Sequence, residues 1–311
     1  MGATGVKSTP GRILLTGATG QVGGELLLPL ASVGEVVAPP HERVDLADVA
    51  NDFRSLRETI RTVRPRWIVN PAAYTAVDKA ESEPESAYAV NQDAVRAIGE
   101  EAERIDAAVI HFSTDYVFDG TGTVAYVETD ATGPMSVYGK SKLAGELALA
   151  NTGAAHLIFR TSWVYGGRGK NFLLTILKLA REREVLRVVG DQHGAPTWSR
   201  DLAAMTLAVM RHCDAEAGTF VEAVKRVGGV YHAAGAGETT WHGFAAQAVR
   251  LERKREPGVR LAEIEAITTA EYPTPARRPV NSRLNCERLT ERFGWRMMGW
   301  QESLRRVLSE L

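Results

Sequence analysis

The sequence predicts an α/β protein, with a doubly wound parallel sheet followed by a smaller mixed α/β domain. Short β-branched or apolar runs alternate with longer helical patterns through the N-terminal half of the chain. The short runs are continuously apolar, which is typical of strands buried on both faces. The first run is followed directly by a glycine-rich turn that opens a helical segment.

The expected strands of the N-terminal half each end near Gly, Pro, Asn or Ser, and they are residues 12–16, 35–38, 66–69, 107–113 and 156–161. Apolar residues at helical spacing fill the segments between them, so we expect helices at residues 23–31, 51–63, 87–104 and 138–150. Parallel strands need long, right-handed crossovers, so these helices would cover both faces of the sheet.

The C-terminal half is more mixed. We expect helices at residues 172–183, 201–212 and 241–251, and a short strand at residues 229–232. Prolines interrupt residues 272–279, which cannot hold regular structure for long. We therefore expect one domain over residues 1–166, in which residues 1–10 form a flexible extension. A smaller domain over residues 167–311 would be partly interleaved with the first.

Composition excludes several classes of protein. The 311 residues carry 37 basic and 38 acidic side chains, a net charge of −1, which is not the charge pattern of a nucleic-acid binder or a polybasic membrane anchor. No run approaches the ~20 apolar residues of a membrane helix. Cys213 and Cys286 lie far apart, so they form neither a disulfide framework nor a zinc site. We expect a soluble, cytoplasmic protein with no nucleic-acid or membrane partner.

The glycine-rich turn predicts a nucleotide site. Gly17, Gly20 and Gly23 follow the first expected strand at G-x-x-G-x-x-G spacing. Such glycines allow a tight turn, a close approach of the backbone to a pyrophosphate, and close packing of helix on strand. The anion would sit on the free N–H groups of the helix N-terminus. Residues 1–166 would then be an NAD(P)-binding domain of the Rossmann type, and residues 167–311 a substrate-binding domain.

The choice between the two nicotinamide cofactors depends on the end of the second expected strand. That strand ends in residues 39–43 (PPHER), with no acid at the strand tip to hold a ribose 2′-hydroxyl. Arg43 favours a 2′-phosphate and hence NADPH, although a solvated loop arginine explains it equally well. NADH, or the use of both cofactors, stays open.

A second group of residues predicts proton transfer. Tyr138 and Lys142 are four residues apart on one face of an expected helix. Tyrosine titrates near pH ~10, and a nearby ammonium that lowered its pKa by ~3 units would stabilise the phenolate by ~4 kcal/mol. Thr114 lies at the end of the fourth expected strand, the edge where open α/β sheets bind ligands. It would hydrogen-bond the reacting oxygen beside Tyr138. His111, within that strand, is expected to be a hydrogen-bonded core histidine.

These residues together resemble the extended short-chain dehydrogenase/reductases, and among them the dTDP-4-dehydrorhamnose reductases. The segments that carry the resemblance are TGATGQVG (16–23), VNPAAYTAVDKAESEP (69–84), HFSTDYVFDG (111–120), VYGKSKLAGE (137–146), FRTSWVYG (159–166), GDQHGAPT (190–197) and YPTPARRPVNSRLN (272–285). They span nearly the whole chain after residue 10.

The resemblance implies NADPH-dependent reduction of the C4 ketone of dTDP-4-dehydro-L-rhamnose to dTDP-L-rhamnose. It implies that Tyr138 donates the proton, that Lys142 tunes Tyr138 and binds the ribose, and that Thr114 polarises the carbonyl. The sugar would contact Thr114, Asp115, Tyr116 and Trp163. The cofactor would contact Tyr138, Lys142 and residues of three loops: Gly17, Thr19, Gly20, Gln21, Val22, Gly23, Asp45, Leu46, Pro71, Ala72 and Ala73.

Charged side chains give two further expectations. Guanidinium groups suit phosphate oxygens, so Arg277, Arg278 and Arg283 are candidates for a clamp on the substrate diphosphate, with solvated arginines as the alternative. Some members of the resembling family dimerise through Mg²⁺ held by glutamates, and Glu25 matches one such position. Residues 197–201 carry no glutamate, so a helix-surface carboxylate is the preferred interpretation of Glu25. We assign no metal site and leave Mg²⁺ and a homodimer open.

Other functions fit parts of the sequence. Dehydratases of this superfamily typically carry Thr-Asp-Glu where this chain has Thr114, Asp115 and Tyr116, so a dehydratase or epimerase would lack an acid/base group. Reductases of other nucleotide-linked 4-keto deoxysugars share the motifs. A non-catalytic, cofactor-binding relative that regulates a partner enzyme could lose Tyr138 or Lys142, and both are present.

Overall fold

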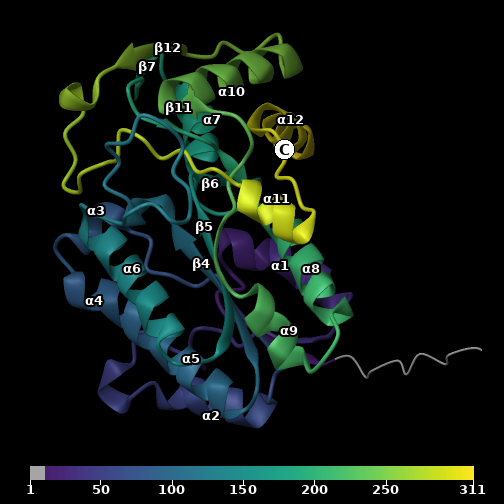
Figure 1. The fold of residues 1–311 in the computed structure, drawn as a ribbon. Coiled ribbons are helices and arrows are strands. Elements are labelled where there is room, and N and C mark those ends of the chain that lie inside the picture. The colour runs from purple at the N-terminus through teal and green to yellow at the C-terminus, as the bar shows by residue number, and fades with distance from the viewer. Residues whose placement is uncertain (1–10) are drawn as a thin grey trace, which may run out of the picture.

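The computed structural model describes residues 11–311, so the expectation for residues 1–10 lies outside the described part of the chain. Six parallel strands form a central sheet with helices on both faces, which confirms the predicted α/β class (Figure 1). The strands follow one another across the sheet in the order β10 (Gly229–His232), β5 (Ala155–Thr161), β4 (Ala108–Thr114), β3 (Trp67–Asn70), β1 (Arg12–Leu15) and β2 (Glu35–Val37). All five neighbouring pairs are parallel.

Side chains that alternate along the strands divide the core between the two faces of the sheet. Ile13 and Leu15 join the cluster that includes residues of α1 (Gln21–Ala31) and α8 (Ser199–Ala215). Leu14, between them, belongs to the cluster on the opposite face. That cluster includes residues of α2 (Arg54–Val63) and α5 (Ala94–Arg104).

The strand order places a ligand crevice beside β1. β2 pairs with one edge of β1, and β3 pairs with the other, so the chain changes direction across the sheet at this point. Open α/β sheets bind ligands at the carboxyl ends of strands next to such a reversal. The glycine-rich turn after β1 and the loop after β3 both lie at this edge.

The second half of the chain is shared between the central sheet and a separate cluster. β10 pairs with β5, and α8 packs on α1, so residues 199–232 return to the sheet. A second set of elements packs around its own aromatic and aliphatic cores. It includes α7 (Phe172–Glu182), α10 (Trp241–Arg255), α12 (Trp300–Glu310) and the parallel pair β7 (Val185–Val189) and β12 (Glu263–Ile267).

Further elements are two pairs of short strands and four helices. They are the pairs β6 (Val164–Tyr165) with β9 (Thr197–Trp198) and β8 (His193–Gly194) with β11 (Thr239–Thr240), and the helices α3 (Val77–Ala80), α6 (Val137–Ala150), α9 (Phe220–Val227) and α11 (Glu287–Phe293).

Two expected helices differ from the structure. The helix expected at residues 51–63 begins only at Arg54, because Asp52 and Phe53 adopt positive φ angles of 49° and 52°. The helix expected at residues 87–104 is divided into α4 (Pro84–Tyr88), a π-helical turn (Ala89–Asp93) and α5. Within this wide turn, the Asn91 side chain bonds the Tyr74 backbone and donates to Ser141 Oγ on α6 at 2.9 Å.

None of the helices over residues 11–311 combines the length and the apolar character needed to cross a bilayer.

Candidate active site

The glycine-rich turn is packed so closely that it has no room for side chains at Gly17 and Gly23. Gly17 has a positive φ of 58°, and a Cβ built on it would lie 2.9 Å from Ala72 Cα. A Cβ on Gly23 would lie 2.0 Å from the Gly17 carbonyl oxygen. Glycine at these positions therefore lets helix α1 sit directly on the turn, with the loop after β3 against it.

The helix N-terminus beside this turn fits an anionic ligand. Gly20 is the N-cap of α1 and supplies no side-chain cap, and Gln21 begins the helix. The Gln21 Oε1 atom is buried and has no hydrogen-bond partner among the described residues. Uncapped N–H groups and the positive end of the helix dipole suit a phosphate. Thr19 is exposed within the turn, and Val22 lies in the first helical turn.

The other residues expected to contact the cofactor lie in two loops at the carboxyl edge of the sheet. In the loop after β3, Ala72 lies between Pro71 and Ala73 and contacts the glycine-rich turn. In the loop after β2, Asp45 accepts a hydrogen bond from Ala47 N at 2.8 Å, and Leu46 is buried in the core below. Arg43 is exposed in the same loop.

Tyr138 and Thr114 meet beside this edge, as the sequence predicts. Thr114 ends β4, and Tyr138 lies in the first turn of α6, where Ser136 caps the helix by accepting from Gly139 N at 3.1 Å. Burial raises the pKa of Tyr138, and a hydrogen bond with Thr114 opposes that rise. The Tyr116 ring meets the Tyr138 ring edge to face, with 5.4 Å between centroids. The Tyr138 hydroxyl is therefore protonated at neutral pH and available as a proton donor.

Asp115 places a carboxyl group next to this pair. Burial raises the pKa of Asp115 to about 6, and hydrogen bonds with Ser282 and Thr114 oppose the rise. Thr114 Oγ1 donates to Asp115 Oδ1 at 3.0 Å, whereas Oδ2 is buried with no partner in the described chain. That oxygen is free to accept a hydrogen bond from a ligand hydroxyl. Ser282 lies in the C-terminal segment 272–285, and no role was assigned to it from the sequence.

Lys142 lies under the site and faces β4. Its Nζ donates to the Phe112 carbonyl oxygen at 2.7 Å and lies 3.3 Å from His111 Nε2. Burial lowers the pKa of Lys142 to about 8, and the Glu146 carboxylate opposes this. The structure therefore differs from the electrostatic expectation for Tyr138, whose pKa is governed by burial and by Thr114. The expectation that His111 is a buried, hydrogen-bonded core histidine is confirmed.

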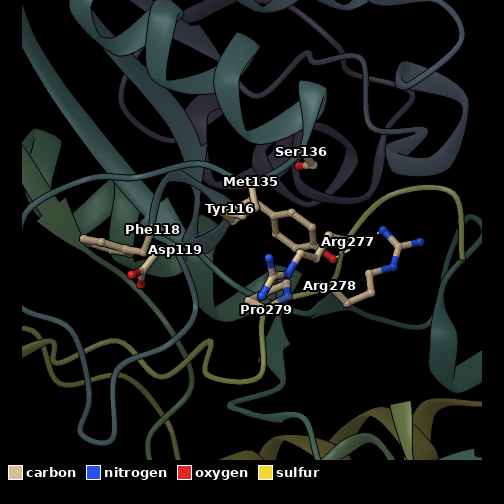
Figure 2. A pocket seen from close by; sticks show the side chains of 8 residues that line it. All are labelled: Tyr116, Phe118, Asp119, Met135, Ser136, Arg277, Arg278 and Pro279. Atoms are coloured by element: carbon tan, nitrogen blue, oxygen red, sulfur yellow. Dashed lines mark hydrogen bonds between the residues drawn. The ribbon is translucent and has the colours of Figure 1, made fainter. Parts of the chain in front are cut away.

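The C-terminal segment brings arginines to the rim of the site (Figure 2). Arg278 Nη2 donates to Asp78 Oδ2 at 2.6 Å, and Nη1 donates to Tyr116 Oη at 3.4 Å. Arg283 is held by Asn281, Glu238 and the Thr123 carbonyl. Of the three candidate arginines, Arg277 and Arg278 line the pocket next to Tyr116, and Arg283 is occupied by its own partners.

Trp163 is held in an unusual conformation. Its φ is 48°, and its ring stacks on Trp241 with 3.7 Å between centroids and 12° between planes. A Cβ on Gly194 would lie 2.5 Å from Trp163 Cε2, so glycine is needed for the ring to fit. Such strain in a bulky residue often marks a ligand site. Trp241, which supports the ring, gave no signal in the sequence.

Glu25 is ion-paired. Its carboxylate accepts from Arg200 Nε at 3.0 Å and lies 3.7 Å from Arg168 Nε. The Glu25 side chain is 14% exposed, so it is a partly buried, ion-paired carboxylate on α1. Across residues 11–311, no three His, Cys, Asp or Glu side chains are grouped so that they could hold a metal ion.

Comparison with known proteins relates residues 11–311 to one family, described as the RmlD substrate binding domain. The chain is 48% identical to the dTDP-4-dehydrorhamnose reductase of Escherichia coli K12 over 301 residues, which cover 96% of this chain and 97% of that protein. A solved dTDP-4-dehydrorhamnose reductase from Clostridium acetobutylicum superposes with a TM-score of 0.85 at 32% identity, covering 96% and 99% of the two chains. The enzyme of that name from Bacillus anthracis, solved in complex with NADP, gives a TM-score of 0.86 at 29% identity, covering 97% and 100%.

Proposed function

The chain belongs to the RmlD substrate-binding-domain family, and on that premise we propose that it reduces the C4 ketone of dTDP-4-dehydro-L-rhamnose to dTDP-L-rhamnose. One observation of this structure carries the proposal. The buried, protonated Tyr138 hydroxyl lies beside Thr114 at the carboxyl edge of the sheet, where the glycine-rich turn also lies.

The cofactor in this proposal is NADPH, which supplies the hydride when bound. The residues present fit a dinucleotide, because Gly17 and Gly23 clear the turn and the N-terminus of α1 has no side-chain cap. The NADP complex of the Bacillus anthracis relative and the absence of an acid at the end of β2 favour NADPH over NADH. Arg43, exposed in that loop, would accommodate the 2′-phosphate.

The proton comes from Tyr138. Its raised pKa keeps the hydroxyl protonated at neutral pH, so Tyr138 can donate when negative charge develops on the C4 oxygen. To donate to the same oxygen, the Thr114 hydroxyl turns its single proton away from Asp115 Oδ1, and the unpartnered Asp115 Oδ2 accepts from a sugar hydroxyl. Lys142 binds the ribose and contributes positive charge beneath the reacting group. Trp163 lines the sugar pocket.

The smaller part of the chain, residues 167–311, supplies the rest of the substrate site. Arg277 and Arg278 lie in the pocket that also contains Tyr116, where guanidinium groups would meet the diphosphate. Asp78 orients Arg278 through a hydrogen bond of 2.6 Å. A homodimer, any role for Mg²⁺ and a cytoplasmic location stay predictions.

The test is direct. Purified protein with NADPH and dTDP-4-dehydro-L-rhamnose should consume NADPH and release dTDP-L-rhamnose, and no loss of NADPH absorbance would exclude this reductase activity. Replacing NADPH by NADH in the same assay measures the cofactor preference. Parallel assays with other nucleotide-linked 4-keto deoxysugars distinguish this substrate from those of related ketoreductases.

A further inference from the structure

A buried chain of polar side chains runs beneath the candidate active site, from α6 to the end of β1. Lys142 Nζ lies 3.3 Å from His111 Nε2, and Asn70 Nδ2 lies 3.1 Å from His111 Nδ1. Thr16 Oγ1 lies 2.5 Å from Asn70 Oδ1. The four residues are between 0% and 5% exposed. The chain thus links the helix that carries Tyr138 to the strand that leads into the glycine-rich turn.

The charge on Lys142 determines which imidazole nitrogen of His111 carries the proton. Burial, followed by the charge of Lys142, holds the pKa of His111 well below its usual range, so the ring is neutral. A neutral imidazole has one donor and one acceptor nitrogen, and an ammonium can only donate. While Lys142 is charged, His111 Nε2 therefore accepts from it, and Nδ1 carries the proton.

The Asn70 amide completes this arrangement. Its two ends lie within hydrogen-bond distance of His111 and Thr16, and a half-turn of the amide exchanges oxygen and nitrogen. With the oxygen toward His111, the amide accepts from Nδ1 and its nitrogen donates to Thr16. The structure has the amide in the reverse orientation, with Nδ2 toward His111 Nδ1 and Oδ1 toward Thr16, which would put the proton on Nε2 and would suit an uncharged Lys142 amine. A charged Lys142 therefore requires the half-turn of the amide.

We propose that His111 is a positioning residue for the reduction, whose Nε2 accepts from Lys142 and, with the Phe112 carbonyl, holds that ammonium under the site. An ammonium has three donors, so these two contacts leave one for the cofactor ribose. The inference rests on the proposed function, because it takes Lys142 as the residue that binds the ribose.

The charges around Lys142 make its protonation depend on the hydrogen-bond acceptor that His111 provides. The titratable groups beside Lys142 are His111 on β4 and Glu146 on its own helix. The Glu146 carboxylate is shared, because Arg160 on β5 donates to both of its oxygens and Ser113 donates to one. Removal of the His111 acceptor would therefore destabilise the ammonium, and Lys142 would lose its proton at a lower pH.

Two variants of similar shape distinguish a His111 that accepts a hydrogen bond from Lys142 from a His111 that only fills space in the core. The amide of glutamine reaches about as far as Nε2, and that of asparagine about as far as Nδ1, so His111→Gln keeps an acceptor for Lys142 and His111→Asn does not. In His111→Asn we expect kcat to fall about tenfold and the alkaline limb of the pH profile to move down by about one pH unit, because a hydrogen bond to a charged group is worth roughly that much. In His111→Gln, kcat and the position of the alkaline limb should both return most of the way to those of the unmodified protein.

A matched control is His232→Asn. His232 is a fully buried histidine of the same sheet, and its Nδ1 lies 3.1 Å from the Tyr126 carbonyl oxygen rather than near Lys142. This variant should lower the melting temperature and leave the alkaline limb in place. An unmoved limb in folded His111→Asn, or equal losses in the Asn and Gln variants, would overturn the positioning role.

A measurement on the unmodified protein covers the case in which a variant does not fold. Nitrogen NMR of the histidine rings below the pKa of Lys142 should show His111 protonated on Nδ1, and an Nε2-protonated ring would overturn the proposal. The NMR spectrum reports this tautomer whether or not the protein turns over a substrate. Failure of the unmodified protein to reduce its substrate would count against the proposed function alone.

Discussion

The buried carboxyl group of Asp115 leads to a prediction about stability as well as activity. Burial raises the pKa of Asp115 from 3.8 to about 6, so the folded protein disfavours the ionised form. The stability contributed by the protonated carboxyl is complete below pH 3.8 and is lost as the pH rises through about 6. Asp115 is 4% exposed, so solvent screens little of this effect. At neutral pH the ionised side chain then costs on the order of 3 kcal/mol.

Asp115→Asn removes the charge and keeps the shape and the acceptor for Thr114. We expect its free energy of unfolding to exceed that of the unmodified protein by about 1–3 kcal/mol at neutral pH, and the difference to shrink toward zero near pH 4. We expect kcat/KM to fall, because the amide presents a donor where the free Oδ2 would accept from a sugar hydroxyl.

The assay is denaturant unfolding at several pH values, with Asp191→Asn as a control of opposite sign. Desolvation favours a higher pKa for Asp191, but hydrogen bonds from Thr269 outweigh it and the pKa is lowered, so the charged form is stabilised. Asp191→Asn should therefore lose stability at neutral pH. A stability difference for Asp115→Asn that stays constant from acid to neutral pH would refute the reasoning, since only titration of this carboxyl produces the slope.

Three further predictions concern the turn, the proton donor and the ion pair. Tyr138→Phe should lose turnover at least about a hundredfold while its melting temperature is retained, and near-normal turnover would remove Tyr138 from its assigned role. Gly23→Ala places a methyl group 2.0 Å from the Gly17 carbonyl, so we expect weaker NADPH binding in a fluorescence titration and a loss of about 1–3 kcal/mol of stability. Gly258→Ala, with nothing within 4 Å, serves as its control. Glu25 is held by two arginines, so chelation of Mg²⁺ should leave activity and sedimentation unchanged, and a chelator-dependent dissociation would contradict this.

Much of the sheet could be predicted because its strands are local patterns. Continuous apolar runs ending at small or polar residues indicated all six strands, including residues 229–232. Their order could not be predicted, since pairing of β10 with β5 joins residues about seventy positions apart. The break in the helix expected at residues 87–104 was also missed. It depends on the tertiary contacts of Asn91 with Tyr74 and Ser141, which helical periodicity does not report.

The site shows the same division between local and distant information. The G-x-x-G-x-x-G turn and the pair Tyr138 and Lys142 are visible because the chemistry needs fixed spacing along one element. Asp78, Ser282 and Trp241 reach the site from separate segments, each through a single contact with a residue that the sequence did identify. The direction of Lys142 was equally hidden, because it is set by burial against β4 rather than by its position on the helix.

The count of proton-transfer groups separates reduction from elimination on this scaffold. Reduction of a ketone by hydride needs one proton at the oxygen, and Tyr138 is the donor that we propose for it. Elimination of a sugar hydroxyl needs both a base for the carbon-bound proton and an acid for the leaving group. Asp115 can serve as one of these, but the residue after it is Tyr116, whose pKa burial raises to about 12. Arg278 donates to that same hydroxyl, so Tyr116 is already hydrogen-bonded as a neutral phenol. A second titratable group that could act near neutral pH is thus missing where elimination needs it, and Tyr116→Glu, which would restore a carboxyl there, is the substitution to make when testing for dehydratase activity.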